Sequence, residues 1–268
     1  FIVSAAVFTR LIGGLGMLPF ITVFSRQIAV YGLINVVGAA LGIFTAVYLS
    51  RHRDLTRQDS FFASLYAVIG FLIGGKLLFI ITILPRLIAR RAELYFGSEL
   101  LSSLLYGGFV FFGGLIGGAA LVWLYCRRYK LPALRMSDSL SPGLTLAHAM
   151  GRIGCFFAGC CFGIEYHGGM AVNINGVARF PVQLLESALL FILTGFLLAF
   201  SRKERAAGKL TGLYIAIYSV MRFCLEFLRG DEVRGSFLML SSSQWISLIL
   251  LPLGAYLIFR PKKSLLLK

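Results

Sequence analysis

The chain has 268 residues, of which 58% are hydrophobic and only 14% are charged. A soluble globular domain carries about 25% charged residues, and the mean hydropathy here is +0.85. Too few polar side chains are present to cover a particle in water, which excludes a soluble enzyme, a disordered chain and a disulfide-stapled secreted domain. The composition predicts an all-α membrane protein, and its 30 glycines would let helices approach one another closely.

The net charge of +15 comes from 26 basic and 11 acidic residues. In a soluble protein such an excess would suggest a nucleic-acid partner. In a membrane protein, basic residues gather in cytoplasmic loops and face anionic lipid headgroups. We therefore expect membrane lipids as partners and no nucleic acid.

The N-terminal segment 1–27 is apolar but carries Arg10 and several glycines, so we expect it to lie at the membrane interface or to pack as an extra apolar segment. After it, runs of about 20 mainly apolar residues predict a bundle of seven transmembrane helices in a single membrane domain, residues 1–268. The predicted spans are 28–50, 60–84, 104–126, 141–162, 182–200, 210–228 and 241–259.

Loop charges predict the orientation of these spans. The loops on one side carry fifteen Lys and Arg residues and those on the other side carry six. The more basic side should be cytoplasmic, which places the N-terminus outside and the C-terminus in the cytoplasm. The loops 85–103 and 163–181 would then be extracytoplasmic, and the second has the glycines and asparagines of an irregular hairpin or arm.

Five charged residues fall inside the predicted spans: Lys76, Arg152, Glu186, Arg222 and Glu226. A charge at membrane depth costs at least about 2.5 kcal/mol on insertion scales, so such residues usually face the bundle interior and often carry function.

Arg222, Glu226 and Arg229 are four and three residues apart, which places them on one helical face. One interpretation is a structural salt bridge that neutralises buried charge. The other is a phosphate site, in which two arginines bind the anion and Glu226 holds one of them in place. The two positive charges and one negative charge of this face would favour an anionic ligand.

A second segment places His148, Arg152 and Cys155 on one helical face. Four glycines in or near it would let a backbone or a lipid headgroup come close: Gly151, Gly154, Gly159 and Gly163. Cys155, Cys160 and Cys161 suggest metal or redox chemistry, but no second cysteine pair at metal-site spacing accompanies them. We therefore expect no metal here and a packing role for these small side chains.

Pro181 begins a span, and Gln183 and Glu186 behind it face the same way. Glu186 could serve the site or could simply neutralise Lys76 or Arg152. The span 104–126 carries six glycines, which indicate either close helix packing or a groove for a lipid chain. Tyr31 would place a phenol at interfacial depth.

Short blocks follow one another along the chain: Tyr31-Gly32-Leu33, Gly74-Gly75-Lys76, Gly113-Gly114-Leu115-Ile116-Gly117, Gly151-Arg152-Ile153-Gly154, Pro181 with Gln183 and Glu186, Gly212-Leu213, Arg222 to Arg229, and Ser243-Gln244-Trp245. In these blocks and in their order the chain resembles the bacterial prolipoprotein diacylglyceryl transferases. The resemblance implies a seven-helix enzyme of the bacterial inner membrane. It would move the diacylglyceryl group of phosphatidylglycerol to the lipobox cysteine of a preprolipoprotein and release glycerol phosphate, with no cofactor.

The resemblance also implies roles for individual residues. The catalytic residues would be Arg152, Arg222 and the partner carboxylate Glu226. The lipid phosphate would be bound by Arg152, Arg222, Arg229, Gly154 and Gly163. The resemblance gives Tyr31 a supporting role, and we expect supporting roles also for Lys76, Phe112, His148, Cys155, Gln183 and Glu186.

The chain departs from the familiar pattern at several positions. Phe112 stands where familiar members carry His or Tyr, and Cys155 stands where they carry Asn. Phe180 and Leu185 replace a His and a Tyr. Since Phe112 can neither take a proton nor donate a hydrogen bond, the chain looks like a divergent paralogue. The alternatives are a phospholipid-dependent transferase with another acceptor and a lipid-binding membrane protein without activity.

Overall fold

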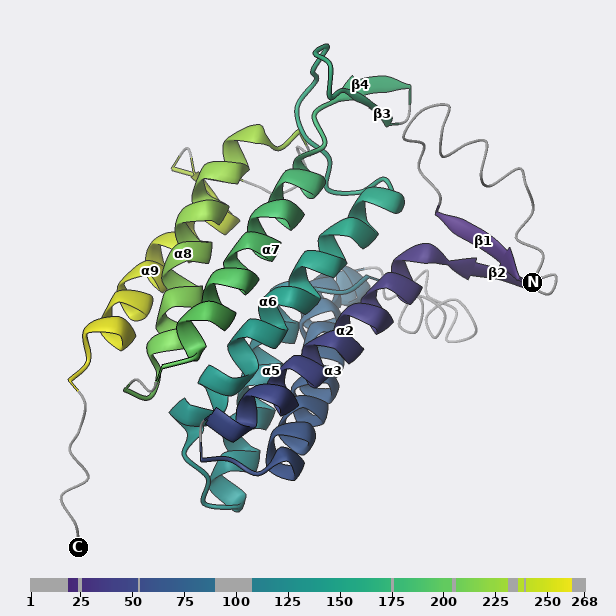
Figure 1. Cartoon of the computed structure of the whole chain (residues 1–268). Coiled ribbons are helices and arrows are strands. Elements are labelled where there is room, and N and C mark those ends of the chain that lie inside the picture. The colour runs from purple at the N-terminus through teal and green to yellow at the C-terminus, as the bar shows by residue number, and fades with distance from the viewer. Residues whose placement is uncertain are drawn as a thin grey trace, which may run out of the picture.

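The computed structural model describes residues 19–23, 26–52, 54–89, 108–174, 176–203, 206–230, 236–238 and 240–261. Most of the predicted segment 1–27 and much of the predicted loop 85–103 lie outside these ranges. The described part contains seven long helices, shown in Figure 1: α2 (Val30–Leu49), α3 (Arg57–Ala89), α5 (Phe111–Arg128), α6 (Ala133–Phe157), α7 (Val182–Ser201), α8 (Lys209–Leu225) and α9 (Ser242–Phe259).

Each long helix overlaps one of the predicted spans, and no closed sheet is present among the described residues. Five of the seven helices are long and apolar enough to cross a membrane: α2, α3, α7, α8 with the short turn behind it, and α9. The other two, α5 and α6, are more polar, since α6 alone carries Arg135, Asp138 and Arg152. The all-α membrane class is therefore confirmed, while the total of seven spans stays a prediction.

Helix α6 differs most from its predicted span, 141–162. It begins at Ala133 and ends at Phe157. Asp138 lies three residues before the predicted span, and the structure buries it completely within α6. Its Oδ2 accepts a hydrogen bond from Gly208 N (2.8 Å) and its Oδ1 accepts one from Thr211 N (2.9 Å), so the carboxylate satisfies the first amides of α8.

Two other helix ends also differ from prediction. Helix α5 begins at Phe111 rather than at 104, and α3 continues to Ala89 beyond the predicted end at 84. The start of α5 is hidden because the residues on both sides of it are apolar. The prediction for α3 ended before Pro85 and Arg86, whereas the helix continues through both residues to Ala89.

Short strands and turns lie before and between the long helices. Strands β1 (Phe20–Val23) and β2 (Arg26–Ala29) form an antiparallel hairpin before α2. Strands β3 (Val172–Ile174) and β4 (Val177–Arg179) form the hairpin predicted within 163–181. The remaining short elements are η1 (Ser50–His52), η2 (Glu226–Leu228), β5 (Ser236–Phe237) and β6 (Leu240–Ser241).

Helices α3 and α5 touch through their glycines. A Cβ atom added to Gly74 would lie 2.3 Å from the carbonyl oxygen of Gly113, and one added to Gly117 would lie 2.3 Å from that of Gly70. The predicted close helix packing is thus confirmed. The alternative of a lipid groove along these glycines is wrong, because α3 occupies that face.

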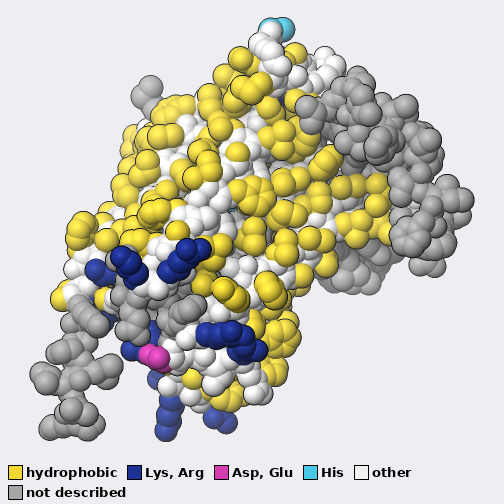
Figure 2. Space-filling model, viewed as in Figure 1, with side chains coloured by type: hydrophobic (Ala, Val, Ile, Leu, Met, Phe, Trp, Pro, Cys, Tyr) yellow, Lys and Arg dark blue, Asp and Glu magenta, His cyan; other side chains and the backbone are white. Residues whose placement is uncertain are grey.

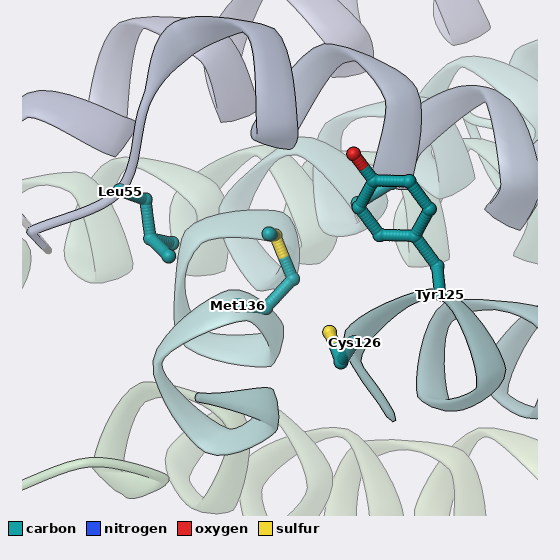
Figure 3. Packing of buried hydrophobic residues seen from close by; sticks show 5 residues of the cluster. Leu55, Tyr125, Cys126 and Met136 are labelled. Carbon is teal, nitrogen blue, oxygen red and sulfur yellow. The ribbon is translucent and has the colours of Figure 1, made fainter. Parts of the chain in front are cut away.

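A small apolar cluster closes the end of the bundle opposite the β3–β4 hairpin. Leu55, Tyr125, Cys126 and Met136 pack together there with Ala63 (Figure 3). The Tyr125 hydroxyl donates a hydrogen bond to Asp59 Oδ1 at 3.3 Å. The cluster joins the loop before α3 to α5 and to the first turn of α6.

The outer surface is largely apolar along the length of the helices (Figure 2). Exposed side chains there include Phe44, Ile116, Ile192 and Ile249. Such a surface is typical of a protein surrounded by lipid. On the face shown, Lys and Arg side chains gather at the end opposite the β3–β4 hairpin.

Candidate active site

Glu186 occupies the second turn of α7 and is 1% exposed. Its Oε2 lies 3.1 Å from Arg152 Nε on α6 and 3.9 Å from Arg222 Nη1 on α8. Its Oε1 accepts a hydrogen bond from the Tyr218 hydroxyl at 3.0 Å and lies 4.0 Å from His148 Nε2. One carboxylate thus joins three helices that lie side by side in Figure 1.

Arg222 is held from two more directions. Its Nη2 donates to Glu226 Oε2 at 2.5 Å and to Ser243 Oγ, in the first turn of α9, at 3.2 Å. The predicted pairing of Arg222 with Glu226 one turn later is therefore confirmed. The guanidinium is fixed by α7, by η2 and by α9, so its planar fork has a defined direction.

The charge of this buried cluster differs from the sequence expectation. The residues 222–229 alone suggested a surplus of positive charge. The structure adds Glu186, so Arg152 and Arg222 face two carboxylates, Glu186 and Glu226. Of the two partners considered for Glu186, the structure contains the pair with Arg152. Lys76, on α3, has its ammonium over the Phe79 ring, 5.3 Å from the centroid.

Several buried polar atoms of the site make no hydrogen bond to any described residue. They are both ring nitrogens of His148, Nε of Arg152, Oε1 of Gln183 and Nη1 of Arg222. Buried polar atoms in native proteins are nearly always satisfied, so a group of unsatisfied ones needs an explanation such as a bound ligand or water. Two of the three arginines predicted to bind the lipid phosphate, Arg152 and Arg222, belong to this group.

His148 lies one turn before Arg152 on α6 and is enclosed by aromatic rings. Its ring centroid is 5.5 Å from that of Phe111 and 4.9 Å from that of Tyr218. Phe111 begins α5 and is followed by Phe112. The imidazole of His148 therefore lies against the start of α5. This is the region where familiar members carry a His or Tyr at the position of Phe112.

Gly154 and Gly163 do not offer open backbone to a lipid headgroup as the sequence predicted. A Cβ atom added to Gly154 would lie 3.1 Å from the Tyr31 ring, so this glycine lets α2 approach α6. One added to Gly163 would lie 2.5 Å from the carbonyl oxygen of Phe180. Gly163 also pairs with Arg229 in an antiparallel bridge. Both glycines are used for contact within the protein.

The loop after α6 runs beside the arginine cluster. Gln183 Nε2 donates to the carbonyl oxygen of Cys160 at 2.7 Å, which ties this loop to the start of α7. The sulfur atoms of Cys155, Cys160 and Cys161 lie within 4.8 Å of one another. Hydrogen bonds with the other two thiols lower the pKa of Cys161, and the positive charge of Arg229 lowers it further.

Sequence reasoning missed two contributors to the site. Tyr218 lies one turn before Arg222 on α8, so the same i, i+4 spacing that singled out Glu226 could have found it. Ser243 belongs to a block that was recognised but not assigned to the site. Its contact with Arg222 depends on the packing of α9 against α8, which no local pattern shows.

These features define a helical integral membrane protein with a buried arginine–carboxylate site between α6, α7 and α8. The family model described as prolipoprotein diacylglyceryl transferase matches residues 19–260, and the chain belongs to this family. The resemblance seen in the sequence is thereby confirmed.

Named relatives cover most of the chain. A phosphatidylglycerol–prolipoprotein diacylglyceryl transferase of Clostridium tetani (strain Massachusetts / E88) is 40% identical over 228 residues, 81% of this chain and 88% of the relative. One of Clostridium perfringens (strain 13 / Type A), numbered 2, is 34% identical over 252 residues, 90% of this chain and 93% of the relative. One of Rickettsia rickettsii (strain Sheila Smith) is 28% identical over 240 residues, 85% of this chain and 90% of the relative.

Proposed function

We propose that this protein transfers the diacylglyceryl group of phosphatidylglycerol to the lipobox cysteine of a preprolipoprotein and releases glycerol phosphate. The observation that carries the proposal is the convergence of Arg152 and Arg222 on Glu186 in the interior of a membrane protein of this family. The names of the relatives, which cover most of the chain, support the same donor lipid and the same acceptor.

In this proposal the lipid phosphate is bound by Arg152 and Arg222. Arginine binds phosphate through two parallel hydrogen bonds from its planar fork. Arg222 Nη1 is buried without a hydrogen-bond partner among the described residues and lies 3.9 Å from Glu186, so it is available as a donor. Arg152 Nε is ion-paired with Glu186 at 3.1 Å, which holds the guanidinium in place. Glu226 orients Arg222, and Arg229 lies just behind it on the same chain segment.

The acceptor thiolate attacks the glycerol carbon that bears the phosphate. The new carbon–sulfur bond forms as the carbon–oxygen bond breaks, and its electron pair leaves with glycerol phosphate, whose charge the two arginines stabilise. A free thiol with a pKa of about 8.5 is only slightly ionised near neutrality, so a base accelerates the step. We assign to His148 the role of accepting the thiol proton. Its imidazole has no hydrogen-bond partner among the described residues and lies 4.0 Å from Glu186.

The proposal places the site towards the extracytoplasmic side of the bacterial inner membrane, with the N-terminus outside and the C-terminus in the cytoplasm. Arg152, Glu186 and Arg222 all lie at the helix ends nearest the β3–β4 hairpin. The basic loop residues lie at the other end of the bundle, which supports a cytoplasmic location for that end.

A turnover assay tests the function directly. The purified protein in nanodiscs is given phosphatidylglycerol and a fluorescent lipobox peptide, and both glycerol phosphate release and peptide mass are measured. We expect a diacylglyceryl mass gain on the peptide cysteine and an equal amount of glycerol phosphate. A peptide whose cysteine is replaced by serine is the control and should stay unmodified.

The second candidate is a transferase with the same donor lipid and another acceptor. It is favoured by Phe112 and Cys155, because both replace polar groups that the resemblance places near the acceptor. Glycerol phosphate release without peptide modification would support this candidate. Tight phosphatidylglycerol binding without any release would contradict both and leave a lipid-binding protein.

A further inference from the structure

The end of α6 brings two cysteines together by a defined backbone motif. Cys160 N donates to the carbonyl oxygen of Cys155 at 3.1 Å, and Gly159 N donates to that of Phe156 at 3.0 Å. Gly159 adopts a φ of 67°, in the left-handed region. These are the two hydrogen bonds and the glycine of a Schellman motif, in which the residues at the positions of Cys155 and Cys160 commonly touch.

A third cysteine joins them at a conformational cost. Cys161 has a φ of 59°, a value that residues with a side chain seldom adopt. Such a conformation persists when the surroundings determine it, and it is found often at functional sites. The result is that all three sulfur atoms lie within 4.8 Å of one another, although the sequence spacing has no second cysteine pair.

Two arginines lie near the three cysteines. The Arg229 guanidinium contacts the Cys161 thiol, and Arg152 lies within electrostatic range of Cys155. Nearby arginines stabilise the negative charge of a thiolate. Cys160 is exposed, so an ion can reach the cluster from solvent. Cys155 and Cys161 are partly buried, so neighbouring residues restrict their side chains.

We propose that Cys155, Cys160 and Cys161 bind a thiophilic metal ion, of which zinc is the simplest example, through three thiolates. Two thiolates bound to one zinc ion, each about 2.3 Å from it, are about 3.8 Å apart, and the present spacing needs only a small contraction to reach this. Each thiol releases its proton on binding. Soft sulfur ligands select ions such as Zn²⁺ and Cu⁺.

Packing alone accounts for only part of this arrangement. Two small side chains in the Schellman contact would explain Cys155 and Cys160, since a free cysteine behaves as a small apolar residue. It does not explain why Cys161 adopts a left-handed conformation beside an arginine. The site is also separate in chemistry from the proposed phosphate site, since it binds a cation through sulfur.

Cobalt is the probe for this proposal, because a Co²⁺–thiolate bond has a charge-transfer absorption. The full chain is reduced, freed of metal with a chelator and titrated with Co²⁺ in detergent. We expect one ion per chain with this absorption, and its loss when Zn²⁺ is added. The variants Cys155→Ser, Cys160→Ser and Cys161→Ser should lose the absorption. Cys224→Ser, at an exposed cysteine on α8, is the matched control and should keep it.

A second measurement does not depend on any variant folding. Zn²⁺ should protect Cys160 of the unmodified chain from an alkylating reagent, as read by mass spectrometry, and a chelator should remove the protection. Cys224 should react equally with and without Zn²⁺. The proposal is overturned if the reduced chain shows neither absorption nor protection. It is also overturned if the three cluster variants bind Co²⁺ as the unmodified chain does, or if the cluster is recovered as a disulfide and takes up no metal after reduction.

Discussion

Glu186 determines how the two central arginines are held, because its carboxylate lies between them. Arg152 approaches it from α6 at 3.1 Å and Arg222 from α8 at 3.9 Å. A buried ion pair of this kind gives little net stability, but removing one partner leaves an uncompensated charge and is strongly destabilising. The cluster therefore has to be tested for folding and for activity separately.

Replacing either arginine by alanine should abolish transfer. We expect Arg152→Ala and Arg222→Ala to lower the rate by at least about hundredfold, since each removes a donor that the proposal assigns to the leaving phosphate. Turnover is measured on protein that elutes as a single folded species from size exclusion. The control is Arg135→Ala, which removes an arginine paired with Asp54 at the opposite end of the bundle. Near-normal turnover in both site variants would rule out the proposed phosphate binding.

Glu186→Gln should lower stability more than a glutamate change at the surface. The amide keeps the size of the side chain but leaves Arg152 and Arg222 without the shared negative charge. We expect a loss of about 3 kcal/mol or more in the free energy of unfolding, measured by denaturation in detergent. Glu165→Gln, at an exposed residue of the arm, should change it by less than about 0.5 kcal/mol. Equal effects of the two changes would contradict the structural role of Glu186.

His148→Ala should slow the chemical step while leaving lipid binding intact. We expect kcat to fall by about hundredfold, the usual contribution of a positioned base, with KM for phosphatidylglycerol little changed. A KM effect alone, or an unchanged kcat, would argue against His148 as the proton acceptor.

At the scale of helices, the glycines set how closely pairs of elements can approach. Glycines on α3 and α5 bring backbone against backbone, and Gly42 and Gly143 do the same for α2 and α6. A Cβ atom on Gly143 would lie 2.2 Å from the carbonyl oxygen of Gly42. In lipid, where the hydrophobic effect does not drive helices together, such close contacts are a main source of association.

Gly74→Ala should therefore destabilise the bundle. The new methyl group would lie 2.3 Å from the carbonyl oxygen of Gly113, so the two helices have to separate. We expect a loss of about 1–3 kcal/mol, read as a lower unfolding temperature in detergent. Gly195→Ala on α7 is the matched control, because nothing lies within 4 Å of its added methyl group. There the change should be neutral or stabilising by up to about 1 kcal/mol. The reverse order of the two variants would contradict the packing described here.

At the scale of the whole molecule, the two ends of the bundle differ in chemistry. One end holds the arginine–carboxylate site, the three cysteines and the β3–β4 hairpin. The other end holds the apolar cluster of Figure 3 and basic residues at the ends of α5 and α7, namely Arg127, Arg128 and Arg202. Because cytoplasmic loops carry an excess of Lys and Arg, the loop-charge rule predicts that the basic end is cytoplasmic.

Reporter fusions test the orientation. Alkaline phosphatase, which is active only outside the cytoplasm, should be active when fused after Gly230 and inactive when fused after Lys203. A green fluorescent protein fused at the same two positions is the matched control and should give the opposite pattern. Alkaline phosphatase activity at Lys203 alone would invert the proposed topology and move the site to the cytoplasmic side.

Composition and local pattern determined the class, the family and the approximate position of each long helix in the described part of the chain, because apolar length and short motifs are properties of each segment alone. The pairing of Arg222 with Glu226 was also predictable, since four residues on a helix bring two side chains together. Helix ends were less predictable where the polar group that marks them is buried, as at Asp138.

Only the tertiary structure decided which faces of those helices meet. Glu186 lies between Arg152 and Arg222 because α7 packs against α6 and α8, and Tyr218 and Ser243 join the site for the same reason. The three thiols meet because the chain reverses after α6 and Cys161 adopts a left-handed conformation. These contacts depend on the packing of segments distant in the chain or on backbone angles, and spacing along the sequence carries neither.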